Sequence, residues 1–228
     1  MKISTEFSKY ATEYGKYNII QEKVATKLLT HVKNRPQNIL DLGCGSGAIA
    51  KKLSWEVEHF VGVDFAPGML ELHPKTSYIE CIHGDFNDDT FFKYLQRYSF
   101  DYIISASALQ WADDLEAVFK NLRGLNTPVA LAIFTSGTFK TLNTTAQLKP
   151  LLRSRNEIEK IAKRYFEDVM FEVVEYKLLF ESVREMFRYI KKSGVSGSRN
   201  ILSYKEAKAL MQAYPLDYLE FEVLFICS

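Results

Sequence analysis

The chain of 228 residues is long enough for one large domain, or for one domain with an insertion. Its 29 basic and 28 acidic residues give a formal net charge of +1, which excludes a globally basic nucleic-acid-binding protein but allows a local basic patch. We expect no membrane-spanning helix and no signal peptide, because no apolar run is long enough and residues 1–12 are polar.

The cysteines and histidines show no arrangement that is typical of a metal site. Cys44, Cys81 and Cys227 are an odd number without metal-like spacing, which favours structural thiols in a reducing cytoplasm. The four histidines form no cluster with one another or with the cysteines. We therefore predict a cytoplasmic protein without a bound metal.

The chain begins with a helical pattern over residues 6–34, which Gly15 divides into two expected helices. Phe7, Ala11 and Tyr14 follow helical spacing in the first of them. An apolar strand is then predicted at residues 38–42, and it leads into a turn with three glycines, Gly43, Gly45 and Gly47. A further helix is expected from about residue 47 to residue 54.

The next segments alternate between strands and short helices. Strands are predicted at residues 59–64, 78–82, 100–105 and 128–134. The helices between them are expected to begin at Pro67, at Asp88 or Asp89, and at Asp113–Asp114. This alternation is typical of an α/β fold with a doubly wound parallel sheet and right-handed crossovers.

After residue 134 the pattern changes. Residues 138–165 are predicted to be helical, residues 172–180 a strand, residues 182–193 and 203–213 helices, and residues 218–226 a final strand. The two late strands are expected to pair as an antiparallel edge, which makes a mostly parallel seven-stranded sheet. We predict one domain: an N-terminal helical segment at 1–36, a ligand-binding core at 37–134, and helical caps at 138–165 and 182–213.

The glycine turn is compatible with more than one ligand. Gly43, Gly45 and Ala48 match the dinucleotide-binding fingerprint, and Asp64 lies at a suitable distance for an acid that binds a ribose. A dinucleotide would place its pyrophosphate at this turn, where Asp41 would repel it. S-adenosylmethionine has no phosphate, and Asp41 would attract its sulfonium and ammonium groups directly or through water. We therefore favour S-adenosylmethionine, and a glycine turn with no ligand is the third alternative.

Three segments carry a resemblance to a known family. Residues 41–47 (DLGCGSG), 63–64 (VD) and 84–86 (GDF) resemble the class I S-adenosylmethionine-dependent methyltransferases, and the resemblance extends over nearly the whole chain. It implies that Asp64 binds the ribose hydroxyls, that Phe65 lies beside the adenine, and that Asp85, assisted by Phe86, binds the adenine amino group. The alternatives are a helix N-cap for Asp85 and core packing for Phe65. The expected cofactor-binding residues are Asp41, Gly43, Gly45, Gly47, Asp64, Phe65, Met69, Asp85, Phe86 and Ser105.

A narrower resemblance concerns the segments around this core. Residues 7–14, 69–70, 105–111 (SASALQW), 134–139 (FTSGTF) and 187–195 (FRYIKKSGV) are together similar to the malonyl-acyl-carrier-protein O-methyltransferase family of biotin synthesis, the BioC family. The Leu-Gln-Trp element is shared with methyltransferases of small carboxylic acids such as trans-aconitate, so it does not choose between the two. The other segments favour the biotin enzyme, from whose pattern Lys140 departs.

This resemblance implies that the methyl acceptor is a carboxylate. A carboxylic acid titrates near ~4, so a malonyl carboxylate is ionised at neutral pH and needs no general base. Its reaction with a sulfonium removes both charges, which a dry pocket favours. We expect Tyr14, Gln110 and Trp111 to form the walls over the methyl group, with core packing as the alternative. Three hydroxyls are candidates to orient the acceptor: Thr135, Ser136 and Thr138.

The resemblance also implies an acidic acyl carrier protein as the partner, and a docking face for it should be basic. One basic cluster comprises Lys149, Arg153, Arg155, Lys160, Lys163 and Arg164. A second comprises Arg184, Arg188, Lys191, Lys192 and Arg199. An ordinary solvated helix face is the alternative for each cluster. Three other functions stay open: methylation of a free small carboxylic acid, non-catalytic binding, and nucleotide-dependent oxidoreduction.

Overall fold

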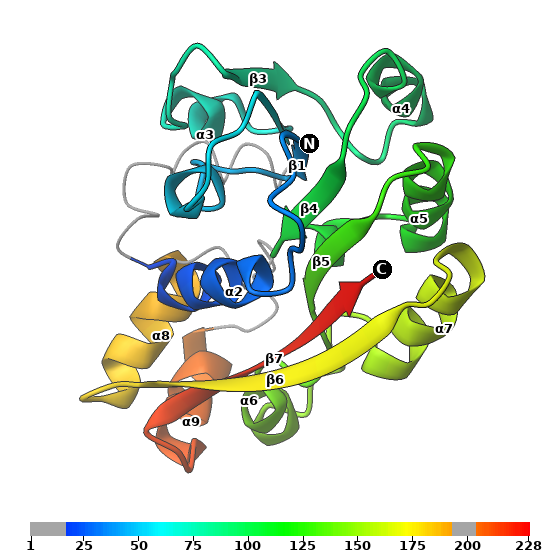
Figure 1. The fold of residues 1–228 in the computed structure, drawn as a ribbon. Coiled ribbons are helices and arrows are strands. Elements are labelled where there is room, and N and C mark those ends of the chain that lie inside the picture. The colour runs from blue at the N-terminus through cyan, green and yellow to red at the C-terminus, as the bar shows by residue number, and fades with distance from the viewer. Residues whose placement is uncertain (1–16, 193–203) are drawn as a thin grey trace.

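The computed structural model describes residues 17–192 and 204–228, which contain a seven-stranded sheet in the order β3-β2-β1-β4-β5-β7-β6 (Figure 1). The first five strands are parallel, and β7 pairs antiparallel with both β5 and β6. The strands are β1 (Asn38–Leu42), β2 (His59–Asp64), β3 (Ile79–His83), β4 (Tyr102–Ala106), β5 (Val129–Phe134), β6 (Met170–Leu179) and β7 (Tyr218–Cys227). The predicted fold class is therefore confirmed.

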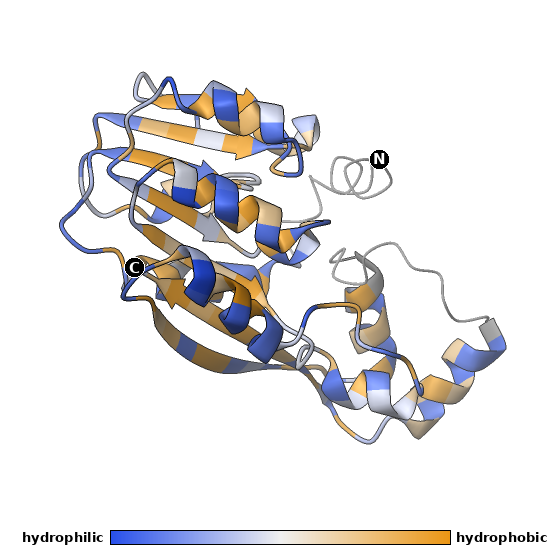
Figure 2. Cartoon of the chain, turned by 90° about the vertical axis from the view of Figure 1, so that its right-hand side faces the viewer, coloured by the Kyte–Doolittle hydropathy of each residue, from blue (hydrophilic) through white to orange (hydrophobic). Residues whose placement is uncertain are grey.

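Helices cover both faces of the sheet. On one face lie α4 (Asp89–Leu95), α5 (Leu115–Gly124) and α7 (Arg155–Tyr165), and on the other lies α2 (Ile19–Leu29) (Figure 1). Shorter elements follow individual strands: the 3-10 turns η1 (Ala50–Lys52) and η2 (Leu109–Trp111), and the helix α3 (Pro67–Glu71). The remaining helices, α6 (Lys140–Thr145), α8 (Val183–Lys192) and α9 (Tyr204–Ala213), lie beyond the end of the sheet at which the parallel strands finish (Figure 2).

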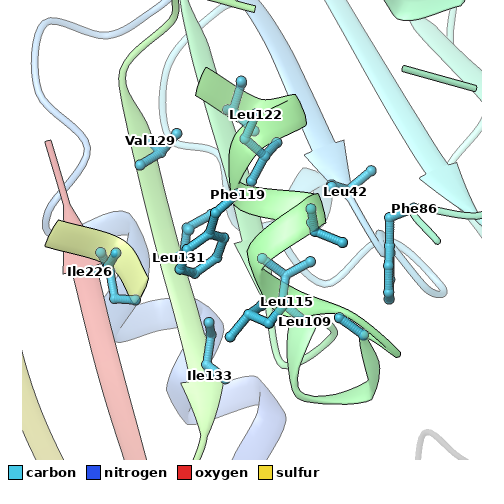
Figure 3. Close-up of a cluster of buried hydrophobic side chains, with 14 of the residues drawn as sticks. Leu42, Phe86, Leu109, Leu115, Phe119, Leu122, Val129, Leu131, Ile133 and Ile226 are labelled. Atoms are coloured by element: carbon cyan, nitrogen blue, oxygen red, sulfur yellow. The ribbon is translucent and has the colours of Figure 1, made fainter. Parts of the chain in front are cut away.

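The core between the sheet and α5 is entirely apolar. Phe119 of α5 points toward Leu131 of β5, and Leu42 of β1 and Ile226 of β7 lie in the same cluster (Figure 3). All four side chains are fully buried. Because β1 and β5 are covered on both faces, β5 is a continuous apolar run and β1 is apolar at Ile39, Leu40 and Leu42, which made both strands recognisable. No helix within residues 17–192 and 204–228 is long and apolar enough to cross a membrane.

Two predicted elements differ from the structure. Residues 47–54 form turns and the short η1 rather than a helix, because Gly47 has φ +84° and the chain leaves helical geometry at Leu53. The prediction of a helical cap over 138–165 is wrong for α7. This helix buries Ile158 and Ile161 in the core between the sheet and α5, so it belongs to the sheet's covering layer.

Some predicted features lie outside the described residues. They include the first expected helix, with Phe7 and Tyr14, and the loop that carries Arg199. Two helix caps predicted from the sequence are present in the structure. The Asp88 and Asp114 carboxylates accept hydrogen bonds from the first turns of α4 and α5, at 2.8 Å from Thr90 N and 3.1 Å from Ala117 N.

Candidate functional site

A pocket opens at the carboxyl ends of β1, β2 and β4. It is lined by α2, the glycine turn after β1, the residues that follow β2 and β3, and the loop after β4. Strand order reverses between β1 and β4, so the connections leaving these strands diverge and leave a crevice between them. In doubly wound sheets such a reversal is the usual place for a ligand.

The glycine turn brings backbone, rather than side chains, to the wall of the pocket. The amides of Gly43 and Cys44 both donate to the Val63 carbonyl, at 2.8 and 2.9 Å, which fixes the turn against β2. A Cβ atom on Gly43 would lie 2.2 Å from the Ala108 Cβ, so the turn and the loop after β4 can approach only at a glycine. A Cβ on Gly45 would meet no atom within 4 Å and would instead occupy the open pocket.

Asp64 is held in a fixed orientation at the end of β2. One carboxylate oxygen accepts a hydrogen bond from Gly45 N at 2.9 Å, and the other accepts one from Ala66 N at 2.8 Å. The residue lines the pocket although it is largely buried, and this burial raises the pKa of its carboxyl. An acceptor that two backbone amides hold in place is well suited to hydroxyl groups of a ligand.

Asp41 lies behind the turn and has a different environment. It is only 1% exposed, and within the described residues neither of its oxygens accepts a hydrogen bond. Burial, followed by the nearby charge of Asp64, raises the pKa of Asp41 from its usual value of 3.8 to about 8. An isolated carboxylate in such a place is costly unless positive charge comes near it.

Of the residues predicted to lie near the adenine, some line the pocket and one, Asp85, does not. Phe65, Met69 and Phe86 line it, and Phe86 also packs in the core beside α5. Asp85 is exposed and does not line the pocket, since its Oδ1 accepts hydrogen bonds from Asn87 N at 2.9 Å and Asn87 Nδ2 at 3.0 Å. The N-cap alternative for Asp85 does not hold either, because Asp88 caps α4. Adenine binding by Asp85 therefore stays a prediction.

Two other predicted cofactor residues support the site from outside the pocket. The Ser105 hydroxyl is completely buried and donates to the Leu42 carbonyl at 2.6 Å, which ties β4 to β1. Gly47 faces His73 and Pro74, where a Cβ would come within 2.4 Å of the Pro74 ring. Direct ligand contact by the Ser105 hydroxyl is incompatible with this geometry.

The predicted acceptor residues are divided in the same way. Trp111 lines the pocket, whereas Gln110 does not and donates from Nε2 to the Ser107 carbonyl at 2.6 Å. Tyr14 lies outside the described residues. The prediction that the hydroxyls of Thr135 and Thr138 orient the acceptor is wrong, because both residues are buried and hydrogen-bonded to Glu222 of β7.

Sequence reasoning missed several residues that line the pocket. Asn18, Gln21 and Ala25 come from α2, and their spacing of three and four places them on one helix face. Ser107 follows β4 and lines the pocket, whereas the sequence analysis predicted Ser105 as the cofactor-binding serine. The apolar spacing of α2 indicated a core-facing helix but could not show that its first turn reaches a ligand site.

The two basic clusters differ in how far their charges are compensated. In the first, Arg155 pairs with Glu159 at 2.6 Å and Arg164 with Glu116 at 2.7 Å. In the second, Arg184 and Arg188 are exposed on α8 and form no ion pair with any described residue. Lys149, Lys160 and Lys163 of the first cluster are likewise exposed and form no ion pair with a described residue, so both clusters keep uncompensated positive charge.

Comparison with known proteins gives matches at the level of both sequence and fold. A methyltransferase domain family matches residues 39–128. The malonyl-[acyl-carrier protein] O-methyltransferase of Bacillus cereus is 27% identical over 92% of this chain and 86% of its own length. The biotin biosynthesis bifunctional protein BioHC of Saccharophagus degradans is 28% identical over 59% of this chain and 24% of its own length. In fold, the YcgJ protein of Bacillus subtilis superposes with a TM-score of 0.60 at 15% identity, covering 88% of this chain and 95% of its own.

These findings identify the cofactor as S-adenosylmethionine. The site fits that molecule on two observations of its own. The unpartnered carboxylate of Asp41 favours a cationic ligand, and the open space at Gly45 admits one close to the backbone. In this arrangement Asp64 would hold the ribose and Phe65 and Met69 would flank the adenine. The dinucleotide alternative is set aside.

The oriented carboxylate of Asp64 predicts a loss of cofactor affinity when it is removed. Replacing Asp64 with Ala should weaken the binding of S-adenosylhomocysteine by roughly 1.5–3 kcal/mol, the scale of hydrogen bonds to a charged group. Titration calorimetry on the purified variant measures this directly. An unchanged affinity would contradict the ribose assignment. Glu71→Ala provides the matched carboxylate control, because Glu71 is exposed on α3 and does not line the pocket.

The raised pKa of Asp41 predicts a pH dependence of stability. The folded protein holds a proton on this group up to about pH 8, whereas the unfolded chain releases it near the usual value of 3.8. The free energy of unfolding of the cofactor-free protein should therefore fall as the pH rises through this window. Asp41→Asn should remove this slope, so the stability of the variant relative to the wild-type protein should increase by roughly 3–4 kcal/mol between pH 5 and pH 8.

Urea unfolding at pH 5 and pH 8 tests this prediction on the wild-type protein and the Asp41→Asn variant. The same variant should bind S-adenosylhomocysteine more weakly, because the charge that favours the ligand's ammonium is gone. Equal slopes for the two proteins would show that Asp41 is compensated by groups other than the cofactor.

Proposed function

We propose that this chain is a class I S-adenosylmethionine-dependent O-methyltransferase whose acceptor is the free carboxylate of a malonyl group carried by an acyl carrier protein. The product would be the malonyl methyl ester that begins the pimeloyl part of biotin synthesis. The names of the relatives support this acceptor, as does the similarity of residues 105–111, 134–139 and 187–195 to the BioC family. We further propose that the reaction takes place in the cytoplasm.

The observation that carries the proposal is the set of titratable groups around the pocket. Among the described lining residues, only Cys44 and Asp64 have side chains that titrate. Burial raises the pKa of the Cys44 thiol well above its usual value, and both oxygens of Asp64 accept backbone hydrogen bonds. Neither group is placed to take a proton from an acceptor. An acceptor that is already ionised, such as a carboxylate, needs no such group.

Catalysis would then depend on position and on the exclusion of water. The bound cofactor supplies an electrophilic methyl group on a sulfonium. The glycine turn and Asp64 hold the methyl donor, and Trp111 is proposed to form a wall beside the methyl group together with Tyr14. Gln110 would support this wall from behind through its hydrogen bond to Ser107. Desolvation favours the step because an anion and a cation combine to give neutral products.

We propose that the carrier protein docks on α8. Arg184 and Arg188 are one helical turn apart, so they present their charges on the same side of the helix. The opposite side of α8 buries Met186 and Tyr189, and the Tyr189 ring lies 6.1 Å from the ring of Tyr17. Tyr17 directly precedes Asn18, which lines the pocket. A carrier on α8 would therefore be anchored close to the site of methyl transfer.

The free-acid alternative rests on the Leu-Gln-Trp element at residues 109–111, which places Trp111 at the pocket. The decisive experiment incubates the protein with labelled S-adenosylmethionine and, separately, malonyl-carrier protein, free malonate and trans-aconitate. We expect a base-labile methyl ester on the malonyl-carrier protein. Label on the free acids alone would contradict the carrier-bound acceptor. Binding of S-adenosylhomocysteine without label in any reaction would favour a non-catalytic role.

The proposed docking face predicts a selective effect of charge reversal. Arg184→Glu and Arg188→Glu should each raise KM for malonyl-carrier protein roughly tenfold, because they oppose an acidic partner. Lys160→Glu on α7 changes the net charge by the same amount and should leave KM within about twofold. Steady-state kinetics at low and high salt measure the effect, which should shrink as salt increases. Equal effects of all three substitutions would locate docking elsewhere.

A further inference from the structure

His73 is a buried titratable residue that has no role in the site described so far. It follows α3, is 3% exposed, and its ring lies 5.9 Å from the ring of Phe60 on β2. Its Nδ1 lies 3.1 Å from the carbonyl oxygen of Pro74, which can only accept a hydrogen bond, so Nδ1 is the donor. In the neutral ring Nε2 then carries no proton, and this atom has no hydrogen-bond partner within the described residues.

Two glycines leave the space that the His73 ring occupies. A Cβ on Gly47 would lie 2.9 Å from His73 Cδ2 and 3.0 Å from Nε2. A Cβ on Gly62 would lie 3.3 Å from the same Nε2 and 3.0 Å from Cys44 Sγ. Gly62 is in the interior of β2, where a glycine weakens a strand and often marks the close approach of another group. Here the imidazole and the Cys44 thiol fill the space that a side chain at position 62 would take.

The ring therefore lies directly behind the glycine turn. Gly43, Cys44 and Gly45 line the pocket, whereas His73 does not. Gly47 N donates to the Cys44 carbonyl at 2.9 Å, which closes the turn at the end that His73 approaches. A change in the position of the ring would thus alter the backbone that forms the pocket wall.

The surroundings of His73 favour its neutral form. Burial, followed by the nearby charge of Lys51 on η1, lowers the pKa of His73 below its usual value of 6.5, and the hydrogen bond to Pro74 opposes this shift only in part. Lys51 is held beside the turn, because its Nζ donates to the Ser46 carbonyl at 2.7 Å. A proton on Nε2 would therefore be buried near a positive charge.

The other titratable groups around Gly62 do not offer a compensating negative charge in the empty protein. Asp41 on β1 and Cys81 on β3 are the two register partners of Gly62, and Cys44 comes from the turn. Asp41 holds a proton up to about pH 8, and burial raises the pKa of both thiols. All three groups are neutral at the pH at which His73 takes up a proton.

We propose that His73 is a positioning residue of the cofactor site: its neutral ring braces the glycine turn from behind, and protonation of the ring releases the turn and weakens cofactor binding. A proton on Nε2 adds a donor where no described residue accepts one, so the charged ring is not stable in this position. The inference rests on the assignment of S-adenosylmethionine as the cofactor and does not depend on the identity of the methyl acceptor.

The test measures S-adenosylhomocysteine binding by titration calorimetry between pH 5 and pH 7.5. His73→Phe keeps a flat ring that cannot be protonated, so its affinity at pH 7.5 should lie within about threefold of the wild-type value. On going from pH 7.5 to pH 5, the wild-type protein should lose roughly threefold more affinity than this variant. Asp41 also titrates in this range, but it is present in both proteins, so the comparison removes its contribution.

His73→Asn separates the brace from the proton. Its amide can still donate to the Pro74 carbonyl, but it lacks the ring edge that lies between Gly47 and Gly62. This variant should bind S-adenosylhomocysteine roughly tenfold more weakly than the wild-type protein at pH 7.5, because the turn is no longer held in its binding geometry. Like His73→Phe, it should lack the additional loss at pH 5. A merely structural role would lower the melting temperature without changing the pH dependence of binding.

His59→Gln is the matched control, because it removes a histidine from the opposite end of β2, where His59 pairs with Glu80 at 3.2 Å. It should keep the wild-type affinity and pH dependence. The same pH dependence in the wild-type protein and the His73 variants would overturn the proposal, as would wild-type affinity in His73→Asn. Either variant suffices for the pH comparison, so the test does not require both to fold. Absence of binding to the wild-type protein at every pH would instead overturn the cofactor assignment, and with it this proposal.

Discussion

The burial of one uncompensated carboxylate is the constraint around which this fold is arranged. Asp41 has a strand on each side and the glycine turn beyond it, and no described residue donates a hydrogen bond to it. The ionised form of Asp41 is unfavourable here, so the empty protein holds a proton on this group up to about pH 8, and a ligand that brings positive charge to the turn favours its ionisation. Two glycines allow a ligand to come close to the turn. Gly43 lets the loop after β4 pack against the turn, and at Gly45 the space that a side chain would fill is left open for the ligand. Asp64 differs because two amides satisfy it, so it serves orientation rather than charge.

The distribution of charge also differs between the pocket and its surroundings. The described pocket lining contains one carboxylate and no cationic side chain, and a second carboxylate lies behind it. Burial raises the pKa of both groups, which limits the negative charge in the empty pocket, and a bound sulfonium and ammonium would favour their ionised forms. Arg184 and Arg188 of α8 do not line the pocket, so on the proposed docking face they would attract an acidic partner without pairing with the acidic groups of the cofactor site. This separation of acidic and basic groups is what the proposed carboxylate acceptor on an acidic carrier protein would require.

The sequence was most informative where local pattern and tertiary environment agree. The apolar residues of β1 and β5 and the caps Asp88 and Asp114 form local patterns in the chain, and these elements were predicted correctly. The exceptions depend on distant partners. The Thr135 hydroxyl is taken up by Glu222, 87 residues away, and nothing in the sequence near Thr135 shows this. The charged surface of α7 suggested a cap because its apolar stripe is narrow, yet that stripe is sufficient to bury Ile158 against the sheet.

Ser107 and Asp41 show why the remaining site residues were harder to predict. Each is unfavourable in the empty protein: Ser107 because of its backbone conformation, and Asp41 because its buried carboxyl accepts no hydrogen bond from a described residue. Sequence-based prediction assumes that each residue suits its local environment, so it does not expect residues such as these. A ligand reverses this preference, because it supplies the hydrogen-bond donors and the positive charge that the protein lacks. The residues that fit the fold least well are therefore the ones that identify what binds here.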